Sequence, residues 1–254
     1  MEQEFYSMIF RRKSFHHFRN VGDDRLTPDE LDGIGKAFEE FDRLDPEIRT
    51  AIRIVPAETV NCARGAAFCI LIYSEKKENF LLNAGDLGEQ LDLWLVQHRI
   101  GSLWYGFGKP DEAAYCGMDF VIMMAIRKVS DSSKFRKELF RAKRRPLDEC
   151  WSGDGLGTAE IARFAPSACN SQPWYVENRD DELTVYRRKK PGKVGLMSPA
   201  AACYFNRIDM GIYLCILELC LEKNGIAYTR TLSTDDGGDR ELTKTAVYRI
   251  NRTL

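Results

Sequence analysis

Three segments of the sequence concentrate residue types that could bind a phosphate group or a flat organic ring. The first is RRKSFHHF at residues 11–18, where two arginines and a lysine precede a serine. Guanidinium groups and a hydroxyl match phosphate oxygens, so this segment could neutralise and hydrogen-bond a phosphate. The alternative is a solvated helix end, whose cations complement the helix dipole.

The second segment is APSACNSQPW at residues 165–174. Its two prolines fix the backbone locally, its small residues would let a flat ligand lie against the chain, and Asn170 and Gln172 carry amides that both donate and accept hydrogen bonds. The alternative is a helix that ends here and enters a strand at Trp174, with proline at the boundary.

Two further segments give weaker signals. GSLWYGFG at residues 101–108 could bring backbone N–H groups to a cofactor ring. The sequence has neither G-x-G-x-x-G after a strand nor G-x-x-x-x-G-K-[ST], so it supports no dinucleotide-binding loop and no P-loop. KFRKELFRAKRR at residues 134–145 reads as a solvated helix face, with a phosphate contact as the alternative.

The apolar pattern predicts the elements that carry these segments. Residues 4–12 place apolar side chains on one helical face, and TPDE at residues 27–30 predicts the N-cap, first-turn proline and capping box of a helix through about Phe41. Apolar runs at 66–73 and 120–126 predict central strands covered on both faces. Alternating residues at 183–187 and 246–250 predict a hairpin strand and a late or edge strand.

Two long buried helices are predicted at residues 83–99 and 206–224, since each carries a stripe of large apolar side chains. Their first nine residues, NAGDLGEQL and NRIDMGIYL, match in Asn, Asp, Gly and Leu at an offset of 123. Self-similarity at half the chain length suggests a duplicated unit. The small and turn-forming residues of 148–156 then mark the junction, which predicts halves at 1–150 and 151–254.

Composition excludes several classes of function. The chain has 254 residues, and 37 basic against 38 acidic residues give a net charge of −1, so neither a nucleic acid nor a membrane partner is expected. Its apolar runs are shorter than the roughly 20 residues that span a bilayer, and the N-terminus lacks the pattern of a signal peptide. We therefore expect a cytoplasmic protein. Eight cysteines without a C-x-x-C pair and only three histidines predict no metal site.

Taken in order, these segments and the two Asn-x-x-Asp-x-Gly helices resemble the nitroreductase family of flavoproteins. RRKSFHHF resembles the family's R-x-S flavin-phosphate motif, and APSACNSQPW is close to its A-P-S-x-x-N-x-Q-P-W signature. NAGDLGEQLDLWLVQHRIGSLWYG at residues 83–106 resembles its central helix and following flavin loop. The resemblance extends over most of the chain and is least distinctive at 180–254. It implies an α+β nitroreductase-like fold, with two fused similar halves, each a mainly antiparallel sheet flanked by helices, around a long buried central helix.

One departure from the family pattern matters. In ordinary members the signature precedes the central helix, and the FMN site is built across a homodimer. Here the signature follows that helix and the Asn-x-x-Asp-x-Gly helix occurs twice. The resemblance therefore implies the duplicated single-chain branch, a fused pseudo-dimer with one FMN per chain, for which a monomer could suffice. A second site would need a signature near residue 42, and DRLDPEIRTA does not provide one.

The resemblance also implies which residues hold the cofactor. Arg12, Lys13 and Ser14 resemble those that bind the FMN phosphate and ribityl chain. Arg136 is expected as a second phosphate ligand, and His16 stands where the family often places Lys or Arg near the flavin pyrimidine. The remaining expected contacts are the loop at the N5 edge, Trp104, Tyr105 and Gly106, and the segment along the isoalloxazine, Pro166, Ser167, Ala168, Asn170 and Gln172.

The implied function is an FMN-dependent oxidoreductase that takes a hydride from NADH or NADPH and reduces nitroaromatic, quinone or related small acceptors in a ping-pong cycle. FMN carries the chemistry, so no side chain is expected to act as acid, base or nucleophile. Two alternatives stay open. One is a flavoprotein of different chemistry in the same superfamily, a dehalogenase or a flavin-fragmenting enzyme, and the other is a non-catalytic duplicated α/β binding module.

Overall fold

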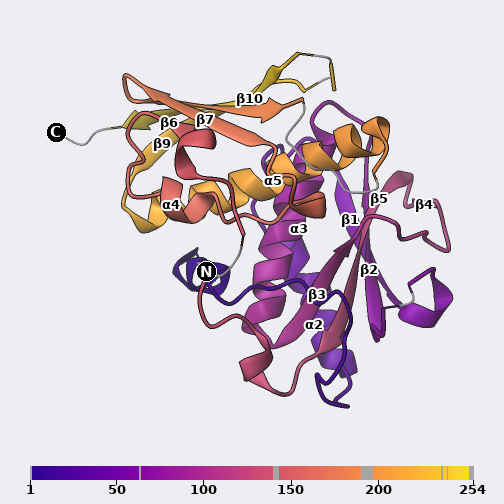
Figure 1. The fold of residues 1–254 in the computed structure, drawn as a ribbon. Coiled ribbons are helices and arrows are strands. Elements are labelled where there is room, and N and C mark those ends of the chain that lie inside the picture. The colour runs from indigo at the N-terminus through magenta and orange to yellow at the C-terminus, as the bar shows by residue number, and fades with distance from the viewer. Residues whose placement is uncertain are drawn as a thin grey trace.

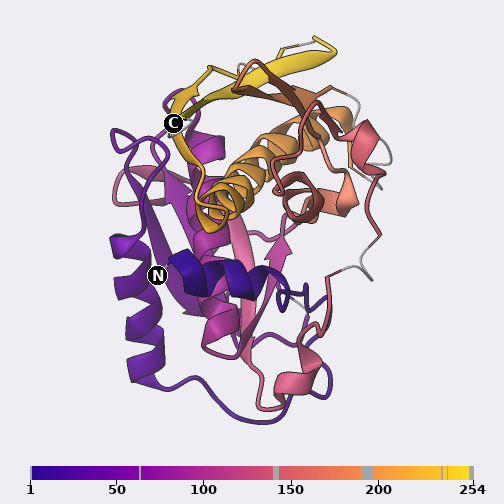
Figure 2. The same ribbon diagram turned by 90° about the vertical axis from the view of Figure 1, so that its left-hand side faces the viewer.

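The computed structural model describes residues 2–62, 64–139, 143–189, 197–235, 237–238 and 240–251. Within them, two sheets lie on opposite sides of a pair of crossing helices (Figure 1; Figure 2). The helices are α1 (Glu2–Ile9), α2 (Pro28–Glu40), α3 (Phe80–Gln97), the short α4 (Ala159–Ala162) and α5 (Pro199–Lys223). The predicted α+β class is confirmed.

The first sheet has the order β1-β2-β5-β3 and is antiparallel throughout. Its strands are β1 (Thr50–Pro56), β2 (Phe68–Ser74), β3 (Ile100–Tyr105) and β5 (Met118–Lys128), and the two-residue β4 (Ala114–Tyr115) pairs with β5. The buried runs predicted at 66–73 and 120–126 correspond to β2 and β5, which lie side by side in the middle of this sheet. Both are covered, as continuous apolar strands require.

The second sheet has the order β6-β7-β8-β10-β9. Its strands are β6 (Trp151–Ser152), β7 (Trp174–Arg179), β8 (Glu182–Arg188), β9 (Ala227–Leu232) and β10 (Leu242–Asn251). Apart from β6, which pairs parallel to β7, the strands are antiparallel. The strand predicted at 246–250 belongs to β10, which lies between β8 and β9 and not at an edge.

The predictions for α2, α3 and α5 agree with the structure to within two residues at their C-terminal ends. Thr27 caps α2 with a capping box completed by Glu30, as the sequence indicates. The two long helices predicted at 83–99 and 206–224 are α3 and α5, which begin three and seven residues earlier. The sequence did not predict β1, β3 and β9, nor the two-residue strands β4 and β6, and a strand beginning at Trp174, which is β7, was only the alternative for residues 165–174. The run that forms β1 is broken by the charged Arg53, and β3 and β9 are short strands directly after long helices.

The helices α3 and α5 approach each other at two glycines. A Cβ atom on Gly85 would lie 2.1 Å from the carbonyl oxygen of Ile208, and one on Gly211 would lie 1.9 Å from that of Leu82. No side chain fits at either contact, so glycine is required for backbones this close. The two contacts are mutual images, because Gly85 and Leu82 relate to Gly211 and Ile208 by the same step of 126 residues.

The same step relates the ends of the two helices. The last residues of α3 and α5 are Gln97 and Lys223, and each is followed two residues later by a left-handed residue, Arg99 (φ 57°) and Gly225 (φ 69°). The strand orders β1-β2-β5-β3 and β7-β8-β10-β9 also correspond. The offset of 123 inferred from the sequence is therefore wrong by about one helical turn. Aligning the two sequences at an offset of 123 pairs Gly88 with Gly211, whereas in the structure the residue that corresponds to Gly211 at the helix crossing is Gly85.

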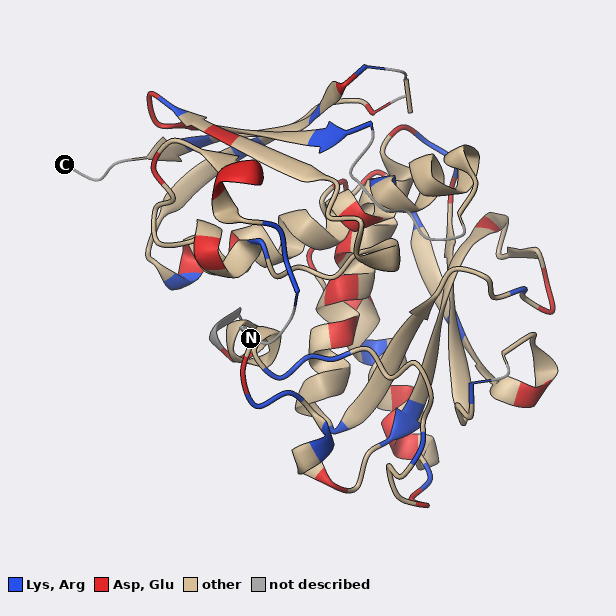
Figure 3. Ribbon diagram, viewed as in Figure 1, with Lys and Arg blue, Asp and Glu red and all other residues tan. Residues whose placement is uncertain are grey.

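The central helix α3 carries buried acids along one face. Asp86, Glu89 and Asp92 are each at most 3% exposed, and Figure 3 shows acidic bands along this helix in the middle of the molecule. The helix α5 is apolar enough to pass a length and composition test for a membrane span, with mean hydropathy 1.2, and 67% of that stretch is buried inside the protein. It packs against α3, α1 and β8, as a core helix does.

Candidate functional site

A cavity of about 270 Å³ lies where β3, the N-terminal segment, the loop after α4 and the helix α5 meet. Its volume is close to the lower end of the roughly 300–1,000 Å³ typical of small-molecule sites. Nine of the thirteen predicted site residues line it: Arg12, Ser14, His16, Trp104, Tyr105, Gly106, Pro166, Ser167 and Ala168. Segments more than 150 residues apart in the chain thus form one site.

Backbone contacts to β3 hold the N-terminal motif in place. Ser14 forms a parallel bridge with Ser102, and the N–H of Phe15 donates to the carbonyl of Ser102 over 2.9 Å. The ring of Phe15 is buried and stacks on Phe18. Because alternate residues of an extended segment face opposite sides, Phe15 enters the core while Arg12 and Ser14 face the cavity.

Arg12 is buried and only partly paired. Its Nε donates to Asp92 Oδ2 over 2.8 Å and its Nη1 donates to Ser14 Oγ over 3.3 Å, but Nη2 has no partner among the described residues. Burial opposes its charge, yet the charge and the hydrogen bond of Asp92 raise the pKa of Arg12. A buried guanidinium with a free N–H edge beside a serine hydroxyl fits an anionic group such as a phosphate.

Two predicted cations lie behind the cavity wall. Lys13 donates from Nζ to the carbonyl of Lys134, and the backbone N–H of Arg136 donates to the carbonyl of Arg11. Burial and the charge of Arg12 lower the pKa of Arg136. Burial together with Arg136, Arg12 and Arg163 lowers the pKa of Arg144 to about 10. Burial is the main cause of both shifts, and repulsion among these cations, which an anionic ligand would relieve, adds to it.

The signature loop is held by α5. Asp209 accepts hydrogen bonds from the backbone N–H of Ala168 (2.9 Å) and the hydroxyl of Ser171 (3.3 Å). Burial raises the pKa of Asp209 to about 8, against the opposing effect of these two donors. The loop also contains left-handed residues at Cys169, Asn170 and Gln172. Such a backbone is held by its surroundings rather than by local preference.

The two amides of the signature support the loop and do not line the cavity. Asn170 Nδ2 donates to the carbonyl of Lys143, and its Oδ1 accepts from Arg144 over 3.0 Å. Gln172 Oε1 accepts from the backbone N–H of Arg145 over 2.8 Å. Arg144 also donates to two carbonyls where the signature begins, those of Phe164 and Ala165. The segment 143–145 therefore holds the signature loop in place by hydrogen bonds, on the side of the loop away from the cavity.

Ten further residues line the cavity that were not predicted from the sequence: Arg64, Leu103, Phe107, Ile122, Cys169, Met197, Phe205, Ile208, Asp209 and Ile212. The last four follow the i, i+3, i+4, i+7 spacing of one helix face, a signal that was present. Arg64 gave no such signal, because only the fold brings its guanidinium to 5.3 Å from the ring of Tyr105. No cluster of His, Cys, Asp or Glu able to hold a metal occurs among the residues that the structure describes.

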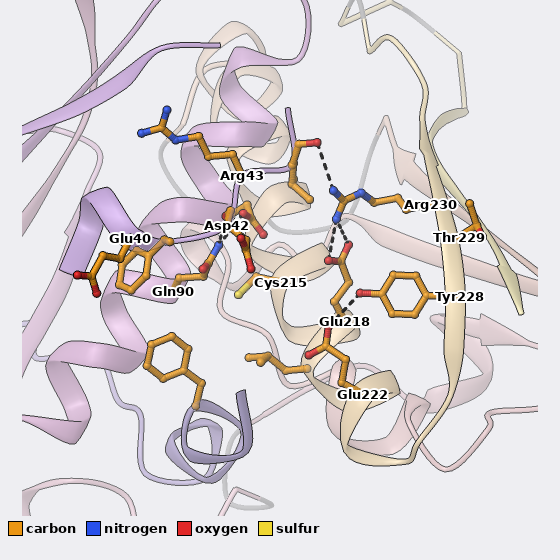
Figure 4. Close-up of a pocket in the computed structure, with 15 residues that line it drawn as sticks. Glu40, Asp42, Arg43, Gln90, Cys215, Glu218, Glu222, Tyr228, Thr229 and Arg230 are labelled. Carbon is orange, nitrogen blue, oxygen red and sulfur yellow. Dashed lines mark hydrogen bonds and ion pairs between the residues drawn. The ribbon is translucent and has the colours of Figure 1, made fainter. Parts of the chain in front are cut away.

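A second and larger cavity, of about 510 Å³, lies at the place that the step of 126 residues relates to the first, again lined by residues of both halves (Figure 4). The signature residues 166–169 correspond, by the same step of 126, to 40–43, which line this cavity. Arg230 stands in the place of Trp104 and donates to both oxygens of Glu218 and to the carbonyl of Leu44. Five acids line it, against two arginines: Glu40, Asp42, Asp86, Glu218 and Glu222. A phosphate would be repelled there.

Comparison with known proteins gives one consistent result. A family model described as "Putative TM nitroreductase" matches residues 4–221. A solved "putative nitroreductase" of Thermotoga maritima aligns over 98% of this chain and 94% of its own, with 18% identity and a TM-score of 0.60. A nitroreductase of Desulfitobacterium hafniense with bound FMN aligns over 59% of this chain and 98% of its own, with 13% identity and a TM-score of 0.43.

A comparison with curated proteins gives no match. The likeness to the Thermotoga maritima structure spans both chains almost completely and shows a shared fold. The family model covers most of the sequence, from the N-terminal helix to the end of α5. The chain therefore belongs to the nitroreductase family that this model describes.

Proposed function

We propose that this protein is an FMN-dependent oxidoreductase that uses NADH or NADPH to reduce nitroaromatic, quinone or related small acceptors. The observation that carries the proposal is the free Nη2 of Arg12, buried beside Ser14 at one wall of a cavity that nine predicted flavin contacts line. Buried polar atoms without partners are rare in proteins, so this N–H edge is suited to a ligand. The cations at 13, 136 and 144 add to the attraction for a phosphate.

We further propose one FMN per chain, in the cavity between the two halves 1–150 and 151–254. The first half supplies the N-terminal motif and β3, and the second supplies the signature loop and α5. The second cavity has acids where a phosphate would need cations, and Arg230 is already used by Glu218. A single chain therefore contains every part of one site, and a monomer suffices.

The residues act by binding and positioning. Bound FMN would supply the redox chemistry, accepting a hydride from a reduced nicotinamide and returning it to the second substrate. Arg12, Ser14 and the nearby cations hold the phosphate end. Trp104, Phe205 and Ile212 provide apolar walls that exclude water, and Asp209 holds the loop of residues 166–168 against the cavity. No side chain is needed as a nucleophile.

The proposal is tested by anaerobic half-reactions of the protein loaded with FMN. NADH or NADPH should bleach the flavin absorbance, and a nitroaromatic or a quinone should restore it in a separate step, with parallel-line steady-state kinetics. If reduced nicotinamides leave the flavin oxidised, the oxidoreductase function is wrong. If the flavin is consumed, or if only a halogenated acceptor restores the absorbance, a different flavin chemistry replaces it.

A further inference from the structure

The buried acid Glu89 has an unusual environment. It lies on α3 with 0% exposure, and neither carboxyl oxygen has a hydrogen-bond donor among the described residues. The guanidinium of Arg12 lies beside it, with its Nε 4.0 Å from Glu89 Oε1. A buried ionised carboxylate without donors is expensive, whereas a protonated carboxyl is much less so.

The groups around Glu89 offer it little compensation. Arg12 gives its Nε to Asp92, and the indole N–H of Trp104, which also lies near Glu89, is donated to Asp92 over 3.1 Å. On its own helix, Asp86 and Asp92 are acidic, and on α5 the facing titratable group is Cys215. Burial, Asp92 and Asp86 raise the pKa of Glu89 well above its usual range, although Arg12 and the indole N–H of Trp104 oppose them.

The protonation of Glu89 sets the charge available to a ligand. Arg12 is paired with Asp92, so a charge on Glu89 behind the cavity wall would oppose the binding of a phosphate at Arg12. It would cancel part of the attraction that Arg12 and the cations at 13, 136 and 144 exert on a phosphate dianion. A neutral Glu89 leaves the free Nη2 of Arg12 and the cation at Arg136 to act on the phosphate.

We propose that Glu89 carries a proton in the folded protein, and that this neutral carboxyl is what allows Arg12 to bind the phosphate of the cofactor. Glu89 is thus a positioning residue that sets the charge of the site without touching the ligand. The inference rests on the proposed function, since it concerns the binding of FMN through Arg12. The buried acid is not a feature that both halves share. The residue of α5 that corresponds to Glu89 by the step of 126 residues is Cys215, which is not an acid.

The test compares FMN dissociation constants of the wild type and Glu89→Gln at pH 7, measured by quenching of flavin fluorescence. A neutral amide replaces a neutral acid, so we expect values within about threefold of each other. If Glu89 were ionised, removing its charge would tighten binding by about tenfold or more, and the proposal would be wrong. Glu39→Gln, which removes an exposed acid on α2, is the control for net charge.

A second readout does not involve the cofactor. In the infrared difference spectrum of wild type minus Glu89→Gln, we expect the carbonyl band of a protonated carboxyl, shifted by D₂O. A carboxylate band in its place contradicts the proposal. If Glu89→Gln does not fold, Glu89→Met gives a neutral side chain of similar volume for both measurements. Failure of the wild type to bind FMN would instead overturn the proposed function and leave the infrared result standing.

Discussion

Trp104 and Arg230 lie 126 residues apart at matching points of β3 and β9, and each donates a hydrogen bond to the acid twelve residues before it. Trp104 donates to Asp92 over 3.1 Å, and Arg230 donates to Glu218 over 2.7 Å. One backbone arrangement thus carries an indole at the wall of one cavity and a guanidinium in the other. The pair shows how two similar halves differ in the side chains that line their cavities.

This difference predicts that two arginine-to-leucine substitutions, one at each cavity, affect different properties: one the stability of the protein and the other its FMN content. Arg230→Leu should lower the free energy of unfolding by about 1–3 kcal/mol, because Glu218 is partly buried and loses its cation, and should leave the FMN content unchanged. Arg12→Leu should remove most of the bound FMN. The FMN content of each variant is measured below its own melting temperature. Loss of FMN in Arg230→Leu would show that the second cavity contributes to binding.

The close approach of α3 and α5 predicts that glycine is required at both contact positions, Gly85 and Gly211, for the protein to be stable. Gly85→Ala and Gly211→Ala should each lower the free energy of unfolding by about 3 kcal/mol or more, since the new methyl group meets a carbonyl oxygen of the facing backbone. Gly35→Ala on α2 is the control, because a Cβ atom there meets nothing within 4 Å. It should stabilise the helix by up to about 1 kcal/mol. Urea denaturation of the three variants measures these differences, and similar values for all of them would contradict the crossing.

The hydrogen bonds from Arg144 to the signature loop predict a change in cofactor affinity when this residue is replaced. Arg144→Gln loses the hydrogen bonds to Asn170, Phe164 and Ala165 and one cation near the site, so the FMN dissociation constant should rise about tenfold or more. Arg179→Gln removes an exposed cation of β7 and should leave it unchanged. Titration with FMN at fixed ionic strength distinguishes the two, and equal affinities would show that these hydrogen bonds do not act on the site.

The raised pKa of Asp209, at about 8, predicts how stability depends on pH. Between pH 4 and 8 the folded protein keeps a proton on this carboxyl that the unfolded chain releases. Asp209 therefore makes the free energy of unfolding fall as pH rises, by up to about 1.4 kcal/mol per pH unit. Asp209→Asn removes this contribution, so its stability curve should be flatter than that of the wild type over this range. Parallel curves from chemical denaturation would contradict a protonated Asp209.

The sequence predicts what local chemistry determines. Thr27 and Glu30 form the capping box on α2 because both partners lie within one helical turn. The motif at Arg12 and Ser14 and the signature at 165–174 could be found because their residue types suit a phosphate and a flat ring. These segments meet in the fold at one cavity.

The sequence cannot show what depends on distant backbone contacts. Two glycines three residues apart in α3, Gly85 and Gly88, could each have paired with Gly211, and only the fold selects the first. The amides of Asn170 and Gln172 point to the segment 143–145 rather than to the cavity, because left-handed residues turn the loop. For the same reason, the placement of Arg64 beside Tyr105 could not be predicted.

The central claim is that one FMN binds per chain between the two halves. The most direct measurement is a titration of the purified protein with FMN, followed by absorbance and by the amount of flavin released on denaturation. We expect one FMN per chain, with weaker retention in Arg12→Ala and in Asn170→Ala, where the loop loses its contacts to residues 143 and 144. A protein that stays colourless with excess FMN, or one that binds two per chain, would contradict this account.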